Sequence, residues 1–170
     1  MSPAHGLLNA LPEAAAREAL ERCCGSSRWV AELLAERPFE SDVALFAAAD
    51  RVWAALGRDD YLEAFAHHPQ IGASLAELRA RFAATSVWSN QEQSGVRGAD
   101  ESTLEALCAK NAQYLARFGY IFIVCASGKS AREMLSLLDA RLDNAAEVEL
   151  RLAAAEQAKI TRLRLEKLAP

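Results

Sequence analysis

Short helical segments, each with its own cap and stop signal, follow one another along most of this 170-residue chain. Pro12 opens an apolar segment that Gly25 stops. Ser41–Asp42 can cap another segment, which ends at Gly57. Caps, stops and 3.6-residue apolar spacing coincide in these segments, so the sequence predicts a succession of short helices.

Composition also favours helices over strands. Apolar residues make up 52% of the chain. Many are alanine and leucine, whereas β-branched residues are sparse. A chain of this length suits one domain with its own core. The predicted fold is therefore all-α, a single domain over residues 1–170 with about eight or nine helices. One apolar run, residues 120–126, is expected to be buried and extended.

Capping boxes predict where two of the later helices begin. Ser102 with Glu105 indicates one helix start, and Asn144 with Glu147 indicates the start of the last helix, which runs toward Leu168. Both pairs have the spacing at which each side chain can satisfy a free backbone N–H of the other residue.

Charge and cysteine usage exclude several classes of protein. The net charge of −4 is spread along the chain without a lysine/arginine block, so no nucleic-acid partner is expected. No apolar run approaches the roughly 20 residues of a membrane span, and the first residues do not resemble a secretory signal. The cysteines form no CxxC pair, which predicts reduced thiols and a cytoplasmic protein. They are Cys23, Cys24, Cys108 and Cys125.

The segment from His67 to Gly72 interrupts the helical pattern and carries two of the three histidines. Histidine titrates near neutral pH, which suits proton transfer. The proline at position 69 disfavours helical backbone at His68. A proton-transfer site and a surface loop with one packed and one solvated histidine both fit this pattern. Because adjacent side chains point apart and His5 is the only other imidazole, no metal site is predicted.

Three further polar groups are candidates for a site. Ser89–Gly95 is a polar run that suits either an exposed loop or recognition of the N–H and C=O groups of a small molecule. Ala126–Ser130 resembles a phosphate loop, but Ile123 stands where the pattern requires glycine, so a capped helix is expected. Cys125 could act as a nucleophile with His68, although its apolar neighbours favour inert packing.

Two arginines on the last predicted helix are also candidates for a site. Arg164 lies between leucines on a largely apolar face, where an arginine usually needs a carboxylate partner or an anionic ligand. Its aliphatic portion could instead cover the apolar face while the charge reaches water. Arg162 lies two residues earlier and therefore faces another direction.

Taken in order, these segments resemble the 2-oxo-4-hydroxy-4-carboxy-5-ureidoimidazoline (OHCU) decarboxylase family. The resemblance covers nearly the whole chain. No single short motif identifies the family, but the ordered set of motifs is specific to it. The matching segments include Phe65 with His68–Gly72, Trp88–Ser89 with Glu92–Gly95, Asn111 with Tyr114 and Arg117–Tyr120, Phe122–Ser130, and Lys159–Ile160 with Arg164–Leu165.

The resemblance implies an all-α homodimer that converts OHCU to (S)-allantoin, the last step from urate, without a metal or an organic cofactor. It implies that His68, Glu92 and Arg164 are catalytic, with Arg162 as a rival for the role of the arginine. The substrate-binding positions that it implies are Pro69, Ser89, Gln93, Phe122, Ile123, Val124, Cys125 and Ala126.

Two other functions stay open at this level. One is a Cys/His hydrolase that uses Cys125 and His68. The other is a non-catalytic helical module whose polar run binds a ligand or partner without reaction.

Overall fold

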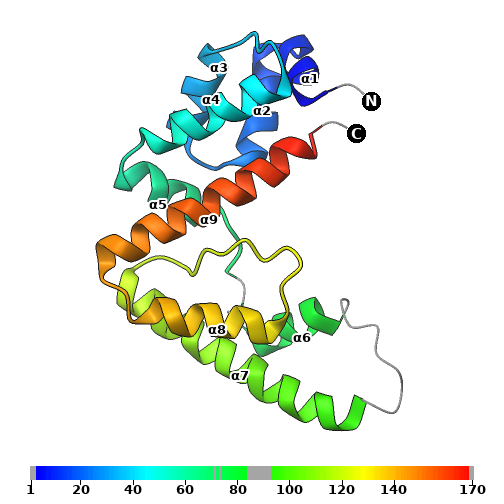
Figure 1. The fold of residues 1–170 in the computed structure, drawn as a ribbon, viewed down its shortest axis with the longest axis vertical. Coiled ribbons are helices and arrows are strands. Elements are labelled where there is room, and N and C mark those ends of the chain that lie inside the picture. The colour runs from blue at the N-terminus through cyan, green and yellow to red at the C-terminus, as the bar shows by residue number, and fades with distance from the viewer. Residues whose placement is uncertain (1–2, 71, 73, 84–92, 169–170) are drawn as a thin grey trace. The chain divides into compact units, whose positions relative to one another are not determined.

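The computed structural model describes residues 3–70, 72, 74–83 and 93–168, and no strand occurs among them. The predicted all-α fold is confirmed, with nine helices in the described part of the chain (Figure 1). The helices are α1 (Ala4–Ala10), α2 (Glu13–Cys23), α3 (Ser27–Ala35), α4 (Asp42–Ala54), α5 (Arg58–Ala66), α6 (Leu75–Ala83), α7 (Gln93–Phe118), α8 (Ala131–Leu142) and α9 (Ala146–Glu166).

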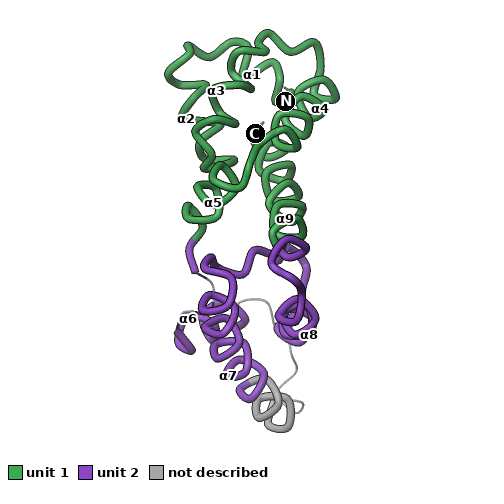
Figure 2. The backbone as a smooth tube through the Cα atoms, turned by 90° about the vertical axis from the view of Figure 1, so that its left-hand side faces the viewer, with its two compact units in different colours: residues 1–68, 150–170 green, residues 69–149 purple. Residues whose placement is uncertain are grey.

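The chain divides into two compact units (Figure 2). Unit 1 comprises residues 1–68 and 150–170, and unit 2 comprises residues 69–149. The chain leaves unit 1 directly after His68, and it returns within α9, whose first residues belong to unit 2. A single domain over residues 1–170 stays a prediction.

Two tryptophans connect the helices of unit 1. Trp29 is fully buried, and its indole N–H donates to the carbonyl of Ala49 at 3.1 Å, which joins α3 to α4. The indole of Trp53 donates to the carbonyl of Ala154 at 2.9 Å, which joins α4 to α9. Because an indole N–H left unpaired inside the core would be costly, these two bonds help to fix how the helices pack.

The first helix of unit 1 was not anticipated from the sequence. Pro3 precedes α1, and the backbone N–H of His5 donates to a carboxylate oxygen of Asp42 at 2.8 Å. The predicted cap at the start of α4 is confirmed, because Ser41 Oγ accepts from the backbone N–H of Ala44 at 3.1 Å.

In unit 2 the predicted start of the long helix is wrong. α7 begins at Gln93 and passes through the pair Ser102 and Glu105 without a break. Glycine weakens a helix by only about 1 kcal/mol, and contacts with neighbouring helices outweigh that cost. One such contact is the ion pair between Arg79 of α6 and Glu101 of α7, with Nε at 2.9 Å from Oε1.

The last helix also starts differently from the prediction. α9 begins at Ala146, and the side-chain amide of Asn144 donates to Glu149 at 3.1 Å. The expected reciprocal pair between Asn144 and Glu147 is therefore replaced by a contact with a residue further along the helix. The helix ends at Glu166, two residues before the predicted end.

The apolar run between α7 and α8 is buried as predicted. Residues 121–126 have no regular secondary structure, and Phe122 through Cys125 are each less than a tenth exposed. The capped start of α8 is also confirmed. Ser130 Oγ accepts from the N–H of Glu133 at 3.2 Å, and the carboxylate of Glu133 accepts from the N–H of Ser130 at 2.7 Å.

Candidate functional site in the described part of the chain

His68 lies just beyond the end of α5. Its backbone N–H donates to the carbonyl of Phe65 at 3.2 Å, and Pro69 then prevents the helix from continuing. The side chain is half-buried, with Nε2 at 2.5 Å from Oε1 of Gln157. The histidine that the sequence singled out thus has one ring nitrogen in a short hydrogen bond.

Gln157 determines which ring nitrogen of His68 carries the proton. This residue of α9 is 0% exposed, and its Nε2 donates to Thr161 Oγ1 at 3.1 Å, so its Oε1 faces His68. An amide oxygen only accepts hydrogen bonds, so Nε2 of His68 must carry the proton. In the neutral imidazole, Nδ1 is then the basic nitrogen.

The surroundings of His68 favour the neutral imidazole. Burial lowers the pKa of His68 below its ordinary value of 6.5, and the hydrogen bond to Gln157 opposes this effect. The positive charge of Arg164 and the neighbouring His67 lower the pKa further. At neutral pH the ring is therefore uncharged and able to accept a proton.

Arg164 lies on the same face of α9 as Gln157 and Thr161, because these residues are spaced by four and three positions. It is half-buried, and its Nη1 lies 3.4 Å from the carbonyl oxygens of Arg22 and Cys23 at the end of α2. A cation suits the free carbonyls of a helix C-terminus. These contacts place the guanidinium close enough for its charge to act on His68.

Arg162 has a different environment. Its Nη2 lies 3.0 Å from Oδ2 of Asp50, and its guanidinium carbon lies 4.3 Å from the centre of the Phe46 ring. Arg162 is therefore engaged with α4. Of the two arginines, Arg164 is the one whose charge affects the histidine.

The loop between α2 and α3 packs against the other histidine. A methyl group at Gly25 would lie 2.5 Å from Cβ of His67, closer than nonbonded carbon atoms approach. His67 itself is exposed, and its Nδ1 lies 3.0 Å from the carbonyl of Glu63. Glycine at position 25 thus lets the chain pass close to the residue beside His68.

Cys23 and Cys24 are buried at the end of α2, near Arg164. Burial raises the pKa of each thiol to about 11, with Arg164 acting in the opposite direction on both. Both thiols are therefore protonated at neutral pH and poor nucleophiles. None of the four cysteines is in a disulfide bond.

The predicted substrate-binding run of unit 2 has two of its carbonyls held by cationic side chains. Arg141 Nη1 donates to the carbonyl of Ile123 at 2.6 Å, and Lys129 Nζ donates to the carbonyl of Cys125 at 2.7 Å. The run from Phe122 to Cys125 is buried, and Ala126 is half-buried. The amine of Lys129 is thereby used within the loop.

The remaining predicted site residues are only partly covered by the structure. Pro69 is exposed. Ser89 and Glu92 lie outside the described residues. Gln93 is the first residue of α7, and its side chain lies outside the description as well. The roles of these residues stay predictions.

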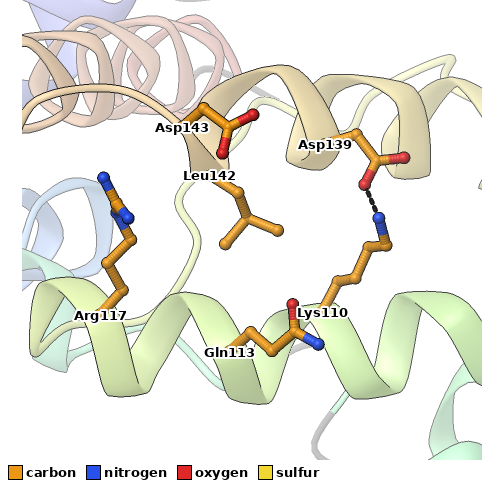
Figure 3. A pocket seen from close by; sticks show the side chains of 6 residues that line it. All are labelled: Lys110, Gln113, Arg117, Asp139, Leu142 and Asp143. Atoms are coloured by element: carbon orange, nitrogen blue, oxygen red, sulfur yellow. Dashed lines mark hydrogen bonds and ion pairs between the residues drawn. The ribbon is translucent and has the colours of Figure 1, made fainter.

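A pocket of about 410 Å³ lies between α7 and α8 and contains none of the predicted site residues (Figure 3). Lys110 and Asp139 form an ion pair across it, and Arg117 donates to the carbonyl of Asn144 at 3.2 Å. The pocket is lined by Lys110, Gln113, Arg117, Asp139, Leu142 and Asp143. Since Lys110 and Arg117 already have partners, the pocket offers no unpaired cation at these positions for an anionic substrate.

A metal site and a membrane-spanning helix are both absent from the described residues. No group of three or more His, Cys, Asp or Glu side chains there is arranged to hold a metal ion. No helix in that part of the chain is long and apolar enough to cross a membrane.

Gln157 and Thr161 were missed by the sequence analysis. Both are buried and lie one turn apart on the face of α9 that also carries Ala153 and Leu165. Two polar residues on an otherwise apolar helical face were a usable signal, because buried polar groups need partners.

These features define an all-α protein in which a neutral histidine is oriented by a buried amide close to an arginine. Comparison with known proteins then gives its relatives. The family model described as OHCU decarboxylase matches residues 9–166, so the chain belongs to the OHCU decarboxylase family.

Individual relatives agree with this assignment. The uric acid degradation bifunctional protein TTL of Arabidopsis thaliana is 40% identical over 147 residues, which are 86% of this chain and 45% of that protein. The 2-oxo-4-hydroxy-4-carboxy-5-ureidoimidazoline decarboxylase of Amia calva is 37% identical over 76 residues, 45% of this chain and 43% of that protein. The chain thus spans less than half the length of the curated relatives that it matches.

Among solved structures, an OHCU decarboxylase crystallised in the presence of (S)-allantoin has a similar fold. Its TM-score is 0.71 and its sequence identity 37%, and the match covers 89% of this chain and 96% of that one.

Proposed function

We propose that this chain catalyses the decarboxylation of OHCU to (S)-allantoin in urate degradation. The observation that carries the proposal is the neutral, oriented imidazole of His68 beside Arg164 in a member of this family. The related structure obtained with (S)-allantoin supports the same product class.

The decarboxylation requires the protein to position the substrate and to transfer protons. OHCU carries a carboxylate and a hydroxyl on one ring carbon, next to a C=N carbon that bears the ureido group. When the bond to CO2 breaks, its electron pair forms a C=C bond and the imine nitrogen gains the displaced pair and a proton. The resulting enol becomes allantoin when the hydroxyl loses a proton and the ureido-bearing carbon gains one. No external electron sink is required, because the imine serves as one.

In this proposal His68 moves the proton. A neutral ring with a basic Nδ1 can take the hydroxyl proton and deliver one to the ureido-bearing carbon. The lowered pKa of His68 makes it enter the reaction as a base and return the proton readily. Arg164 binds a carbonyl or carboxylate oxygen by its planar guanidinium.

Other positions are proposed from the family resemblance. Glu92 and Gln93 would hold the ureido and ring N–H groups, and Ser89 and Pro69 would contact the substrate. Backbone groups over residues 122–126 would bind the edge of the ring. A cofactor is not part of this proposal.

The test is the rate of CO2 release from freshly generated OHCU. The chain should accelerate release well above the spontaneous rate, and Cys125→Ser should leave that acceleration intact. Loss of turnover in Cys125→Ser would favour the cysteine hydrolase. Release at the spontaneous rate only would favour a ligand-binding module.

A cytoplasmic homodimer is proposed alongside this activity. The four cysteines, three of them buried and none in a disulfide, suit a reducing compartment. Sedimentation equilibrium should give twice the mass of the chain, and a monomeric mass would contradict the dimer.

A further inference from the structure

A buried ionic cluster lies beside the irregular run of unit 2. Glu149 is 0% exposed, and its carboxylate accepts hydrogen bonds from Arg141, Tyr114 and Asn144. The Nε of Arg141 lies 2.8 Å from Oε1 of Glu149, and the Nη2 of Arg141 binds the same oxygen. Arg141 thus binds Glu149 through two of its three guanidinium nitrogens.

The third nitrogen of the same guanidinium points at the backbone run. Nη1 of Arg141 donates to the carbonyl of Ile123 at 2.6 Å, and the guanidinium carbon lies 4.6 Å from the centre of the Phe122 ring. Because the guanidinium is planar, fixing two nitrogens on Glu149 also fixes the direction of the third. The carbonyl of Ile123 is therefore held at a position that the cluster sets.

The contribution of a buried ion pair to stability does not by itself explain the contacts of Arg141 and Glu149. A buried ion pair loses much of its attraction to the cost of desolvating both charges, and an apolar replacement is often as stable. Residues 121–126 belong to neither a helix nor a strand, so no ladder of backbone hydrogen bonds fixes their groups. Arg141 holds this stretch at the carbonyl of Ile123, as Lys129 holds it at the carbonyl of Cys125.

We propose that Arg141, oriented by Glu149, is a positioning residue that holds the backbone at Ile123 so that the groups of residues 122–126 meet the substrate in one geometry. This proposal rests on the proposed function, in which that run binds the ring edge of OHCU. A displacement of about 1 Å in a binding group is enough to cost a large part of an enzyme's efficiency.

The decisive variant is Arg141→Lys, which keeps the charge but cannot bind Glu149 through two nitrogens and the Ile123 carbonyl at once. Its matched control is Arg117→Lys. Arg117 also donates to a backbone carbonyl of unit 2, that of Asn144 at 3.2 Å, and lies 5.3 Å from an aromatic ring, that of Phe118. Two readouts are compared, amide hydrogen exchange by residue and steady-state kinetics on fresh OHCU.

In Arg141→Lys, the amides of residues 122–126 should exchange about tenfold faster or more, the scale expected for losing a charge-assisted hydrogen bond. The KM for OHCU should rise about tenfold, with a smaller change in kcat. Amides within α7 and α8 should keep their protection. Arg117→Lys should match the wild type in both readouts. Glu149→Gln keeps the size of the side chain and an acceptor oxygen, and it should show the same pattern at smaller size if the lysine variant does not fold.

Unchanged exchange over residues 122–126 would overturn the proposal, and so would faster exchange with a wild-type KM. Equal loss of protection throughout unit 2 would also overturn it, since that result describes general destabilisation. A wild-type protein that fails to accelerate CO2 release would refute the proposed function instead, while the exchange data would still decide whether Arg141 anchors the run.

Discussion

At the scale of single residues, the hydrogen bond from His68 to Gln157 fixes which ring nitrogen can react. Gln157 uses both ends of its amide, one on Thr161 and one on His68, so rotating it would break two bonds. The imidazole is thereby oriented by an uncharged amide. The hydrogen bond to the neutral amide offsets only part of the lowering of the His68 pKa by burial, whereas a carboxylate in its place would raise the pKa further.

Gln157→Glu should therefore shift the pH dependence of the reaction. An anion beside Nε2 stabilises the imidazolium, so the pKa of His68 rises and the acidic limb of kcat/KM moves to higher pH by about one unit or more. The measurement is a pH profile of kcat/KM for both proteins. Gln113→Glu, the same change at an exposed position of α7, should leave the profile in place. No shift, or a shift to lower pH, would contradict the proposed role of this amide.

The two arginines of α9 should respond differently to the same substitution. Arg164→Lys replaces the planar fork by a point charge, and kcat/KM should fall about tenfold or more. Arg162→Lys should keep activity within about twofold, because its partners are Asp50 and the ring of Phe46. Steady-state kinetics on both variants decide the matter. A larger loss in Arg162→Lys would transfer the role to Arg162.

At the scale of elements, the way in which α2, α3 and α5 come together depends on Gly25. Its lack of a side chain lets the chain between α2 and α3 pass the His67 ring. Gly25→Ala should destabilise the protein by about 1–3 kcal/mol, since the surrounding structure must shift to make room. Urea denaturation measures this loss.

The added methyl group can be given room by a second substitution. Because the clash involves His67, the double variant Gly25→Ala/His67→Ala should recover part of the lost stability, which a double-mutant cycle detects. Strictly additive effects would show that the methyl group is accommodated elsewhere.

Element boundaries were predictable from sequence where a local signal decided them. The caps at Ser41 and Ser130 use side chains a few residues from the backbone groups that they bind, so local signals were enough to predict a capped helix at each place. The start of α7 was misplaced because contacts distant in sequence, such as Arg79 with Glu101, support the helix across its glycines. α1 was missed because the residue that holds its start, Asp42, lies 37 positions away.

In the candidate site, too, some residues were predictable from the sequence and others were not. The position of His68 followed from the proline after it and from the family resemblance. Its partner Gln157 lies 89 residues further along the chain, and only the fold brings the two together. The cluster of Glu149 and Arg141 escaped notice for a related reason. Charged residues in a helical sequence usually face water, and nothing in their spacing indicated that both would be buried.

At the scale of the whole molecule, His68 links stability to pH. The pKa of His68 is lower in the folded protein than its ordinary value of 6.5 in an unfolded chain. Between these two values the unfolded state binds more protons, so acidification favours unfolding. The stabilising effect of the neutral ring is thus fully present above pH 6.5 and is lost as the pH falls toward the folded-state pKa.

Wild type and His68→Asn should therefore diverge on acidification. Urea unfolding at a series of pH values from 7 to 5 should show a steeper loss of stability in the wild type. His67→Asn serves as the control and should stay close to the wild type, because His67 is the smallest contributor to the lowered pKa of His68. Parallel curves for wild type and His68→Asn would show that this histidine is not held neutral by the fold.

In the proposed mechanism His68 delivers a proton to one face of an intermediate formed from OHCU. The most direct test is the optical activity of the allantoin produced from freshly generated OHCU. The wild type should give (S)-allantoin faster than spontaneous decay. His68→Asn should lower kcat by about 100-fold to 10,000-fold and lose most of the enantiomeric excess, while its circular dichroism stays helical. Racemic allantoin from the wild type, or (S)-allantoin at an undiminished rate from His68→Asn, would contradict the claim.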